Sequence, residues 1–250
     1  ENGVWRMDYA DMDRKLKEHN IHFAIFCSPH NPTGRVWERE EIEKAMEIYK
    51  ANECVVISDE IWSDLTLPGF KHIPTQSVSK DARERTIALY APSKTFNLAG
   101  LQISNIFIPN EKLRKAFQTE IDKTGYDEPN ALGIVACEAA YRAGEDWLDQ
   151  LRAYLLKNLN FLRDFLQEKI PQIHLVEPEG TYLVWLDCSE LGITGKELDQ
   201  FIVDKAGLWL DGGSMFGPSG AAFQRVNIAC PRATLELALN KLKAAVDNLK

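Results

Sequence analysis

Cysteine is scarce in this 250-residue chain, and no two cysteines form a C-x-x-C pair. The five that occur are odd in number, widely spaced and mostly set in apolar strings: Cys27, Cys54, Cys137, Cys188 and Cys230. Such spacing is not typical of a disulfide framework or of a zinc site. We therefore predict buried thiols in a reducing compartment, and the cytoplasm as the location.

Other absences narrow the class of protein further. No segment approaches the roughly 18 consecutive apolar residues of a membrane helix. The five histidines include no H-x-x-x-H pair, so we expect no metal site. Basic residues number 29 against 37 acidic ones, and the net charge of -8 argues against nucleic acid or an anionic membrane as a partner. A hydrophobic fraction of 45% with 26% charged residues is typical of a soluble protein of one or two domains.

The hydrophobic pattern of the first half predicts a parallel sheet. Amphipathic helices are expected at Asp11–Glu18 and Glu38–Ala51. Short, largely apolar strands are expected at Ile21–Cys27, Cys54–Ser58, Thr86–Tyr90 and Ile103–Ile108. Apolar strands that alternate with amphipathic helices are typical of a parallel sheet covered on both faces.

The pattern changes to helices and then to a mixed unit in the second half. Helices are expected at 111–123, 130–142, 146–169, 196–205 and 234–249, and strands at 173–176, 181–186, 208–210 and 225–228. We therefore predict an α/β fold in two parts. Residues 1–149 form part of a large parallel-sheet domain, and residues 150–250 form a smaller C-terminal α+β domain.

Four polar motifs lie at or after predicted strands. They are Asn31-Pro32-Thr33-Gly34, Asp59-Glu60-Ile61-Trp62, Ser93-Lys94-Thr95-Phe96 and, in the second half, Arg225 within Phe223–Ala229. Open α/β sheets bind ligands at the carboxyl ends of their strands, where the first three motifs fall. Each motif alone also has a simpler explanation: a plain turn, a helix or turn cap, a solvated lysine, and an arginine on a solvated strand face.

Together the motifs supply the parts of one cofactor site. A lysine amine in a desolvated place can react with an aldehyde. A carboxylate can pair with a pyridinium nitrogen, and the planar guanidinium of an arginine binds a substrate carboxylate through two hydrogen bonds. This combination is that of a pyridoxal phosphate site.

In their order and separation, the first three motifs resemble the fold-type I pyridoxal phosphate enzymes of the aspartate aminotransferase superfamily. Three segments, 91–102, 179–183 and 227–232, resemble more narrowly the MalY/PatB branch, whose members are mostly cystathionine β-lyase-type C–S lyases. The resemblance covers essentially the whole chain and corresponds to the C-terminal portion of these longer proteins.

The resemblance implies a role for each matching residue. Lys94 is the catalytic residue that binds the cofactor aldehyde, and Asp59 pairs with the pyridine nitrogen. Asn31 donates a hydrogen bond to the phenolic oxygen, and Ile61 lies against the ring face. Arg225 binds the substrate carboxylate. Each of these assignments is tied to a motif position in this sequence.

The chain departs from typical aminotransferases in two respects, at one position near the phenolic oxygen and at two phosphate-binding positions. Trp62 stands where they carry a tyrosine, and Gln102 stands where they commonly carry a phosphate-binding arginine. Ala91 also replaces a serine that is common three residues before the lysine. Both departures from the phosphate-binding pattern are similar to the lyase branch. Trp62 and Ser93 complete the predicted cofactor-binding set.

The resemblance implies a pyridoxal 5'-phosphate-dependent C–S β-lyase. Its substrates would be cystathionine or cysteine-like amino acids, its products a thiol, pyruvate and ammonia, and its assembly a homodimer. Two alternatives stay open: an aminotransferase that uses the same residues, and a cofactor-free folded remnant or interaction module. In longer family members the phosphate loop precedes the segment matched here, so we expect this chain alone to bind the cofactor weakly or not at all.

Overall fold

The computed structural model describes residues 3–126 and 128–249, which divide into two compact units. One unit comprises Arg6–His30 and Arg35–Asp149. The other comprises the chain from Gln150 onward, together with Asn31–Gly34 and the segment up to Trp5. The inclusion of Asn31–Gly34 in the second unit was not expected. The assignment of residues 1–149 and 150–250 to a cofactor-binding part and a small domain stays a prediction.

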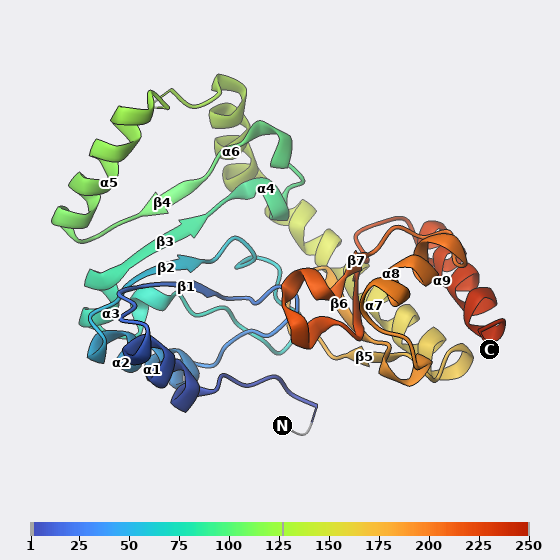
Figure 1. The fold of residues 1–250 in the computed structure, drawn as a ribbon. Helices are drawn as coiled ribbons and strands as arrows, with labels where there is room; N and C mark the ends of the chain where they lie inside the picture. The colour runs from blue at the N-terminus through green and yellow to red at the C-terminus, as the bar shows by residue number, and fades with distance from the viewer. Residues whose placement is uncertain (1–2, 127, 250) are drawn as a thin grey trace. The chain divides into compact units, whose positions relative to one another are not determined.

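The first unit contains a four-stranded sheet in the order β1-β2-β3-β4 (Figure 1). Its strands are β1 (Phe23–Cys27), β2 (Val55–Asp59), β3 (Thr86–Tyr90) and β4 (Asn105–Phe107). The first three are parallel, as predicted. β4 was predicted in the parallel sheet but runs antiparallel to β3. The connection between them turns back at the carboxyl end of β3 instead of crossing a face of the sheet, which would be needed for a parallel return.

Three helices, α1 (Tyr9–Glu18), α2 (Arg39–Ala51) and α3 (Lys80–Arg85), bury one face of this sheet. Ile42 and Met46 of α2 pack there with Phe26 of β1 and Val56 of β2. On β1 the alternate residues Phe23 and Ile25 are 52% and 70% exposed. The prediction of helices on both faces is therefore wrong for the described residues, because all three helices pack against the side to which Phe26 points.

The remaining elements of the first unit follow β3. They are α4 (Pro92–Thr95), the 3-10 turn η2 (Ala99–Leu101), α5 (Glu111–Thr124), α6 (Ala131–Ala143) and the start of α7 (Glu145–Lys169); a further 3-10 turn, η1 (Thr75–Ser77), precedes α3. Pro92 occupies the first turn of α4, where its missing N–H costs nothing. The Phe96 ring at the end of α4 lies 5.8 Å from the rings of both Tyr141 and Trp147. These contacts anchor the short helix that carries Lys94.

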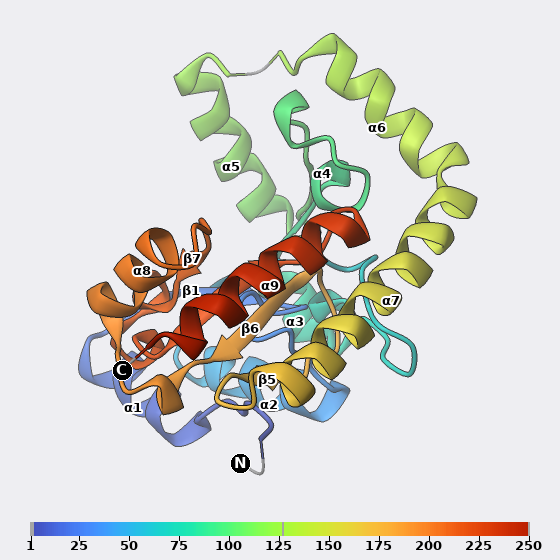
Figure 2. The ribbon, with the colours of Figure 1, turned by 90° about the vertical axis from the view of Figure 1, so that its right-hand side faces the viewer.

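The second unit contains an antiparallel sheet in the order β5-β6-β8-β7. Its elements are β5 (His174–Val176), β6 (Leu183–Asp187), β7 (Asp211–Gly212), β8 (Phe223–Asn227), α8 (Gly195–Asp204), α9 (Arg232–Asp247) and the 3-10 turns η3 (Ser189–Leu191), η4 (Gly213–Phe216) and η5 (Pro218–Gly220). Helices α7 and α9 lie over one face of this sheet (Figure 2). Their buried leucines, among them Leu159 and Leu242, form the core there.

The strand predicted at 208–210 is wrong. That apolar triplet has no ladder partner, and β7 begins at Asp211, opposite Arg225 of β8. Trp209 within the triplet is 91% exposed. Apolar character alone therefore misplaced this strand, because strand pairing rather than composition decides where a ladder begins.

All five cysteines are free thiols. Cys54, Cys137 and Cys188 are buried, as predicted, whereas Cys27 and Cys230 are half-buried. Burial raises the pKa of the Cys188 thiol to about 12, which makes it unreactive at neutral pH. None of the described helices combines the length and apolar character that a bilayer crossing requires.

Candidate active site

Asp59 lies at the carboxyl end of β2, in register with Cys27 of β1 and Leu89 of β3. The alternation of side chains along a strand places it on the same face as Ile57, opposite the face that α1–α3 cover. Its Oδ1 accepts a hydrogen bond from the Ile61 N–H at 3.2 Å. The predicted carboxylate therefore stands at the ligand-binding edge of the parallel strands.

The electrostatic surroundings of Asp59 favour a cationic partner. Burial raises the pKa of the Asp59 carboxyl above its ordinary value, and the neighbouring Glu60 charge adds to this rise. The Ile61 N–H and the Lys94 ammonium oppose it. A partly desolvated carboxylate is stabilised by a nearby positive charge, so this position suits a protonated ring nitrogen.

Lys94 lies in α4, four residues after the end of β3. Its side chain is half-buried, and its Nζ lies 5.9 Å from the centroid of the buried Trp62 ring. The hydroxyl of Thr95 donates a hydrogen bond to Asp64 at 2.8 Å and so ties α4 to the segment that follows Trp62. Ser93 is also half-buried. The structure thus places Asp59, Ile61, Trp62, Ser93 and Lys94 in one unit.

Arg225 and Asn31 belong to the second unit. The Arg225 Nη1 donates to the Asn31 Oδ1 at 2.8 Å, and the guanidinium lies 5.0 Å from the centroid of the Phe216 ring. Asp211 of the adjacent β7 accepts hydrogen bonds on one oxygen, from Nη2 at 2.5 Å and from Nε at 3.2 Å. The arginine predicted to bind a substrate carboxylate therefore already has a carboxylate partner. Asp211 was not predicted from the sequence.

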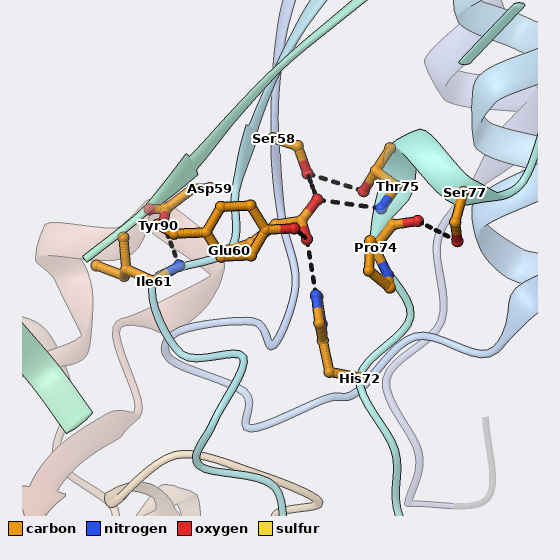
Figure 3. Close-up of polar contacts among 9 residues, drawn as sticks. All are labelled: Ser58, Asp59, Glu60, Ile61, His72, Pro74, Thr75, Ser77 and Tyr90. Carbon is orange, nitrogen blue, oxygen red and sulfur yellow. Dashed lines mark hydrogen bonds and ion pairs between the residues drawn. The ribbon is translucent and has the colours of Figure 1, made fainter. Parts of the chain in front are cut away.

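Glu60 is the second residue that sequence reasoning missed, although it stands inside a motif that was singled out. Its side chain is fully buried and accepts hydrogen bonds from four groups (Figure 3). The donors are the Ser58 hydroxyl at 2.8 Å, the Thr75 N–H at 3.0 Å, His72 Nε2 at 2.7 Å and the Tyr90 hydroxyl. An acidic residue directly after a buried strand is a signal for such a cluster, but three of the four donors, Thr75, His72 and Tyr90, come from distant segments.

No group of three or more His, Cys, Asp or Glu among the described residues is arranged to bind a metal ion. The reactive groups that the structure does bring together are the amine of Lys94 and the carboxylate of Asp59, which interact electrostatically. An amine and a carboxylate at neighbouring strand ends can bind an aldehyde and a basic heterocycle, respectively.

Comparison with known proteins identifies the class. Residues 2–242 match the family described as aminotransferase class I and II, and the chain belongs to this family. It is 40% identical over 246 residues to cystathionine beta-lyase PatB of Bacillus subtilis, which covers 98% of this chain and 64% of that protein. It is 33% identical over 233 residues to Protein MalY of Escherichia coli, covering 93% of this chain and 59% of that protein.

A solved structure agrees with these similarities. The pyridoxal phosphate-bound C–S lyase of Staphylococcus hominis superimposes with a TM-score of 0.92 at 38% identity, covering 98% of this chain and 62% of that one. The predicted resemblance to the MalY/PatB branch and the predicted fold-type I class are thereby confirmed. The chain spans less than two thirds of the length of these relatives.

Proposed function

We propose that the protein is a pyridoxal phosphate-dependent C–S β-lyase. Its substrates would be cystathionine or cysteine-like amino acids, which it cleaves to a thiol, pyruvate and ammonia. We further propose that it works as a homodimer in the cytoplasm. The observation that carries the proposal is the electrostatic interaction between the half-buried Lys94 amine and the partly buried Asp59 carboxylate, which follow neighbouring strands. The similarity to a cystathionine beta-lyase and to a C–S lyase supports it.

The described residues fit this cofactor. Asp59 would hold the pyridine nitrogen, since its raised pKa reflects a carboxylate that a cation would stabilise. Lys94 would hold the aldehyde, with Ser93, Ile61 and Trp62 as further cofactor contacts. Asn31 would donate to the phenolic oxygen. When bound, pyridoxal phosphate supplies an electron-accepting ring that stabilises negative charge at the substrate Cα.

Lys94 and Arg225 would then have separate roles in the reaction, proton transfer and substrate binding. The Lys94 Nζ, once it is a free amine, accepts the Cα proton as a general base. Its half-buried position limits access of water to that amine. The Arg225 guanidinium would bind the substrate carboxylate through two hydrogen bonds.

Trp62 and Gln102 favour lyase over aminotransferase activity. They stand where typical aminotransferases carry tyrosine and arginine, and Trp62 has no phenol with which to bond the cofactor oxygen. Trp62 is 3% exposed, so its ring fills space beside Lys94 and is not a surface substitution.

Product analysis tests the proposal. The whole protein, purified and supplied with pyridoxal phosphate and cystathionine or cysteine, is expected to form pyruvate and thiol in equal amounts without an added keto acid. Turnover that requires a keto acid and releases no thiol would instead identify an aminotransferase. Absence of any cofactor-dependent turnover, together with absence of cofactor uptake, would indicate a binding module without this chemistry.

A further inference from the structure

Glu60 is a fully buried ionisable group that the proposed reaction does not use. Burying a carboxylate costs several kcal/mol unless hydrogen bonds replace its water. Ser58 and Thr75 donate to Oε1, and His72 and Tyr90 donate to Oε2, so the roughly four acceptor sites of a carboxylate are all used. Burial by itself would raise the pKa of the Glu60 carboxyl, but the bonds from His72 and Tyr90 outweigh burial and lower it. Glu60 is therefore an ionised, fully bonded group.

The directions of these hydrogen bonds are determined by the acceptor. A carboxylate donates nothing, so Ser58 donates its hydroxyl hydrogen to Glu60 and accepts one from the Thr75 hydroxyl at 2.8 Å. His72 likewise carries hydrogen on Nε2, while its buried Nδ1 has no hydrogen-bond partner in the described structure. The cluster in Figure 3 is thus a one-way network that converges on Glu60.

The network joins the two strand ends that carry the proposed chemistry. Glu60 directly follows Asp59, and its backbone N–H continues the ladder to Leu89 at 2.9 Å. Tyr90 is the last residue of β3, four residues before Lys94. The hydrogen bond between Glu60 and Tyr90 therefore links the segment that carries Asp59 to the segment that carries Lys94.

We propose that Glu60 is a positioning residue which, through Tyr90, holds Asp59 and Lys94 in their relative places. The inference rests on the proposed function, because it assigns those two residues to one site. An apolar side chain of similar volume commonly gives a core at least as stable as a buried ion does. Hydrogen bonds are directional, however, and a carboxylate bonded from three separate segments restricts position more narrowly than apolar contacts do.

Two substitutions distinguish a role of Glu60 in positioning Asp59 and Lys94 from a role in the stability of the fold alone. Tyr90→Phe removes one hydroxyl and keeps the ring that packs edge-on against Phe107 at 5.6 Å. Glu60→Gln keeps the volume and removes the charge. The matched control is Tyr49→Phe, which removes a buried phenol hydroxyl from α2 in the same unit.

The first measurement uses purified protein without cofactor. Lysines are methylated with formaldehyde and cyanoborohydride, and the rate at Lys94 is followed by peptide mapping. We expect Tyr90→Phe and Glu60→Gln to raise the Lys94 rate at least threefold, because the half-buried amine becomes more accessible. The rate at Lys115 on the exposed face of α5 should stay constant, as should the Lys94 rate in Tyr49→Phe. An unchanged Lys94 rate in folded Tyr90→Phe would overturn the proposal, whether or not Glu60→Gln folds.

The second measurement is the dissociation constant for pyridoxal phosphate. We expect Tyr90→Phe to raise it at least fivefold and Tyr49→Phe to leave it unchanged. An equal loss of stability in both variants with an unchanged constant would show a purely structural role and overturn the inference. These constants are measured on the whole protein, and if its wild-type form does not take up pyridoxal phosphate, the proposed function fails. The Lys94 methylation rate then still decides whether Glu60 controls the position of that amine.

Discussion

The Arg225 guanidinium and the Asp211 carboxylate form an ion pair across the β7–β8 ladder. Asp211 accepts from Nη2 and Nε, the edge of the guanidinium that suits a bidentate carboxylate. A substrate carboxylate that binds Arg225 as proposed would therefore displace Asp211 or bind beside it. Because the Asp211 side chain is 44% exposed, the pair contributes at most about 1 kcal/mol, and displacement is feasible.

Replacing Asp211 by Asn should lower the KM for amino-acid substrates, by up to about fivefold, since the competing charge is removed. Steady-state kinetics with cysteine or cystathionine measures the change. Asp199→Asn is the control, because the Asp199 carboxylate accepts a hydrogen bond from Gln224, the residue next to Arg225 on β8. A higher KM in Asp211→Asn would show that Asp211 orients the arginine instead of competing for it.

Replacing Arg225 by Ala should raise the KM about 10- to 150-fold, which corresponds to the roughly 1.5 to 3 kcal/mol of a hydrogen bond to a charged group. Arg163→Ala on α7, which breaks a bidentate pair with Glu177, should leave the KM unchanged. An unaltered KM in Arg225→Ala would exclude the arginine from substrate binding.

Borohydride reduction of the cofactor-loaded protein should leave the pyridoxyl group on Lys94, because a half-buried amine beside Asp59 is the lysine that the site presents. Peptide mapping by mass spectrometry identifies the labelled residue. Lys94→Ala should abolish the label, and Lys123→Ala on the exposed side of α5 should retain it. A pyridoxyl group on another lysine of the wild-type protein would refute the assignment.

Gly34→Ala should destabilise the protein by about 1 to 3 kcal/mol, measured as the free energy of unfolding in urea. The φ angle of Gly34 is +73°, and an added Cβ would lie 2.7 Å from the Pro178 Cβ. Its carbonyl also accepts from the N–H groups of Glu179 and Gly180. Gly192 is the matched control, since its φ is +74° but a Cβ there meets nothing within 4 Å. Equal losses in both variants would mean that the contact with Pro178 adds no cost.

The Glu60 carboxyl has a pKa below its ordinary value of 4.5, so its contribution to stability is present above pH 4.5 and is lost as the pH falls through the folded-state pKa. Glutamine does not titrate. The difference in unfolding free energy between the wild-type protein and Glu60→Gln should therefore shrink below pH 4.5. Urea titrations at pH 6 and at successively lower pH values provide the comparison, and a constant difference would contradict an ionised Glu60.

Local patterns were predictable from the sequence because local spacing determines them. An amphipathic helix was expected at Glu38–Ala51, and Ile42, Ala45, Met46 and Tyr49 are indeed buried on α2. The direction of strand pairing was harder to predict from the sequence. β4 runs antiparallel to β3 because the connection between them stays at one edge of the sheet. The individual motifs that carry Asp59 and Lys94 were found from their places after apolar strands. Most partners of Arg225 and Glu60 were not. Asp211 lies 14 residues from Arg225, and His72 and Tyr90 lie 12 and 30 residues from Glu60, so only the folded chain brings them together.

The saturated carboxylate of Glu60 has an evolutionary consequence. An apolar replacement at position 60 would leave buried donors from Ser58, His72 and Tyr90 without an acceptor, and a single substitution cannot accommodate all of them. These positions should therefore vary together among homologues. A lineage that exchanges the acid for an apolar residue is expected to carry Phe at position 90 and an apolar side chain at position 72, with both changes inherited as a set.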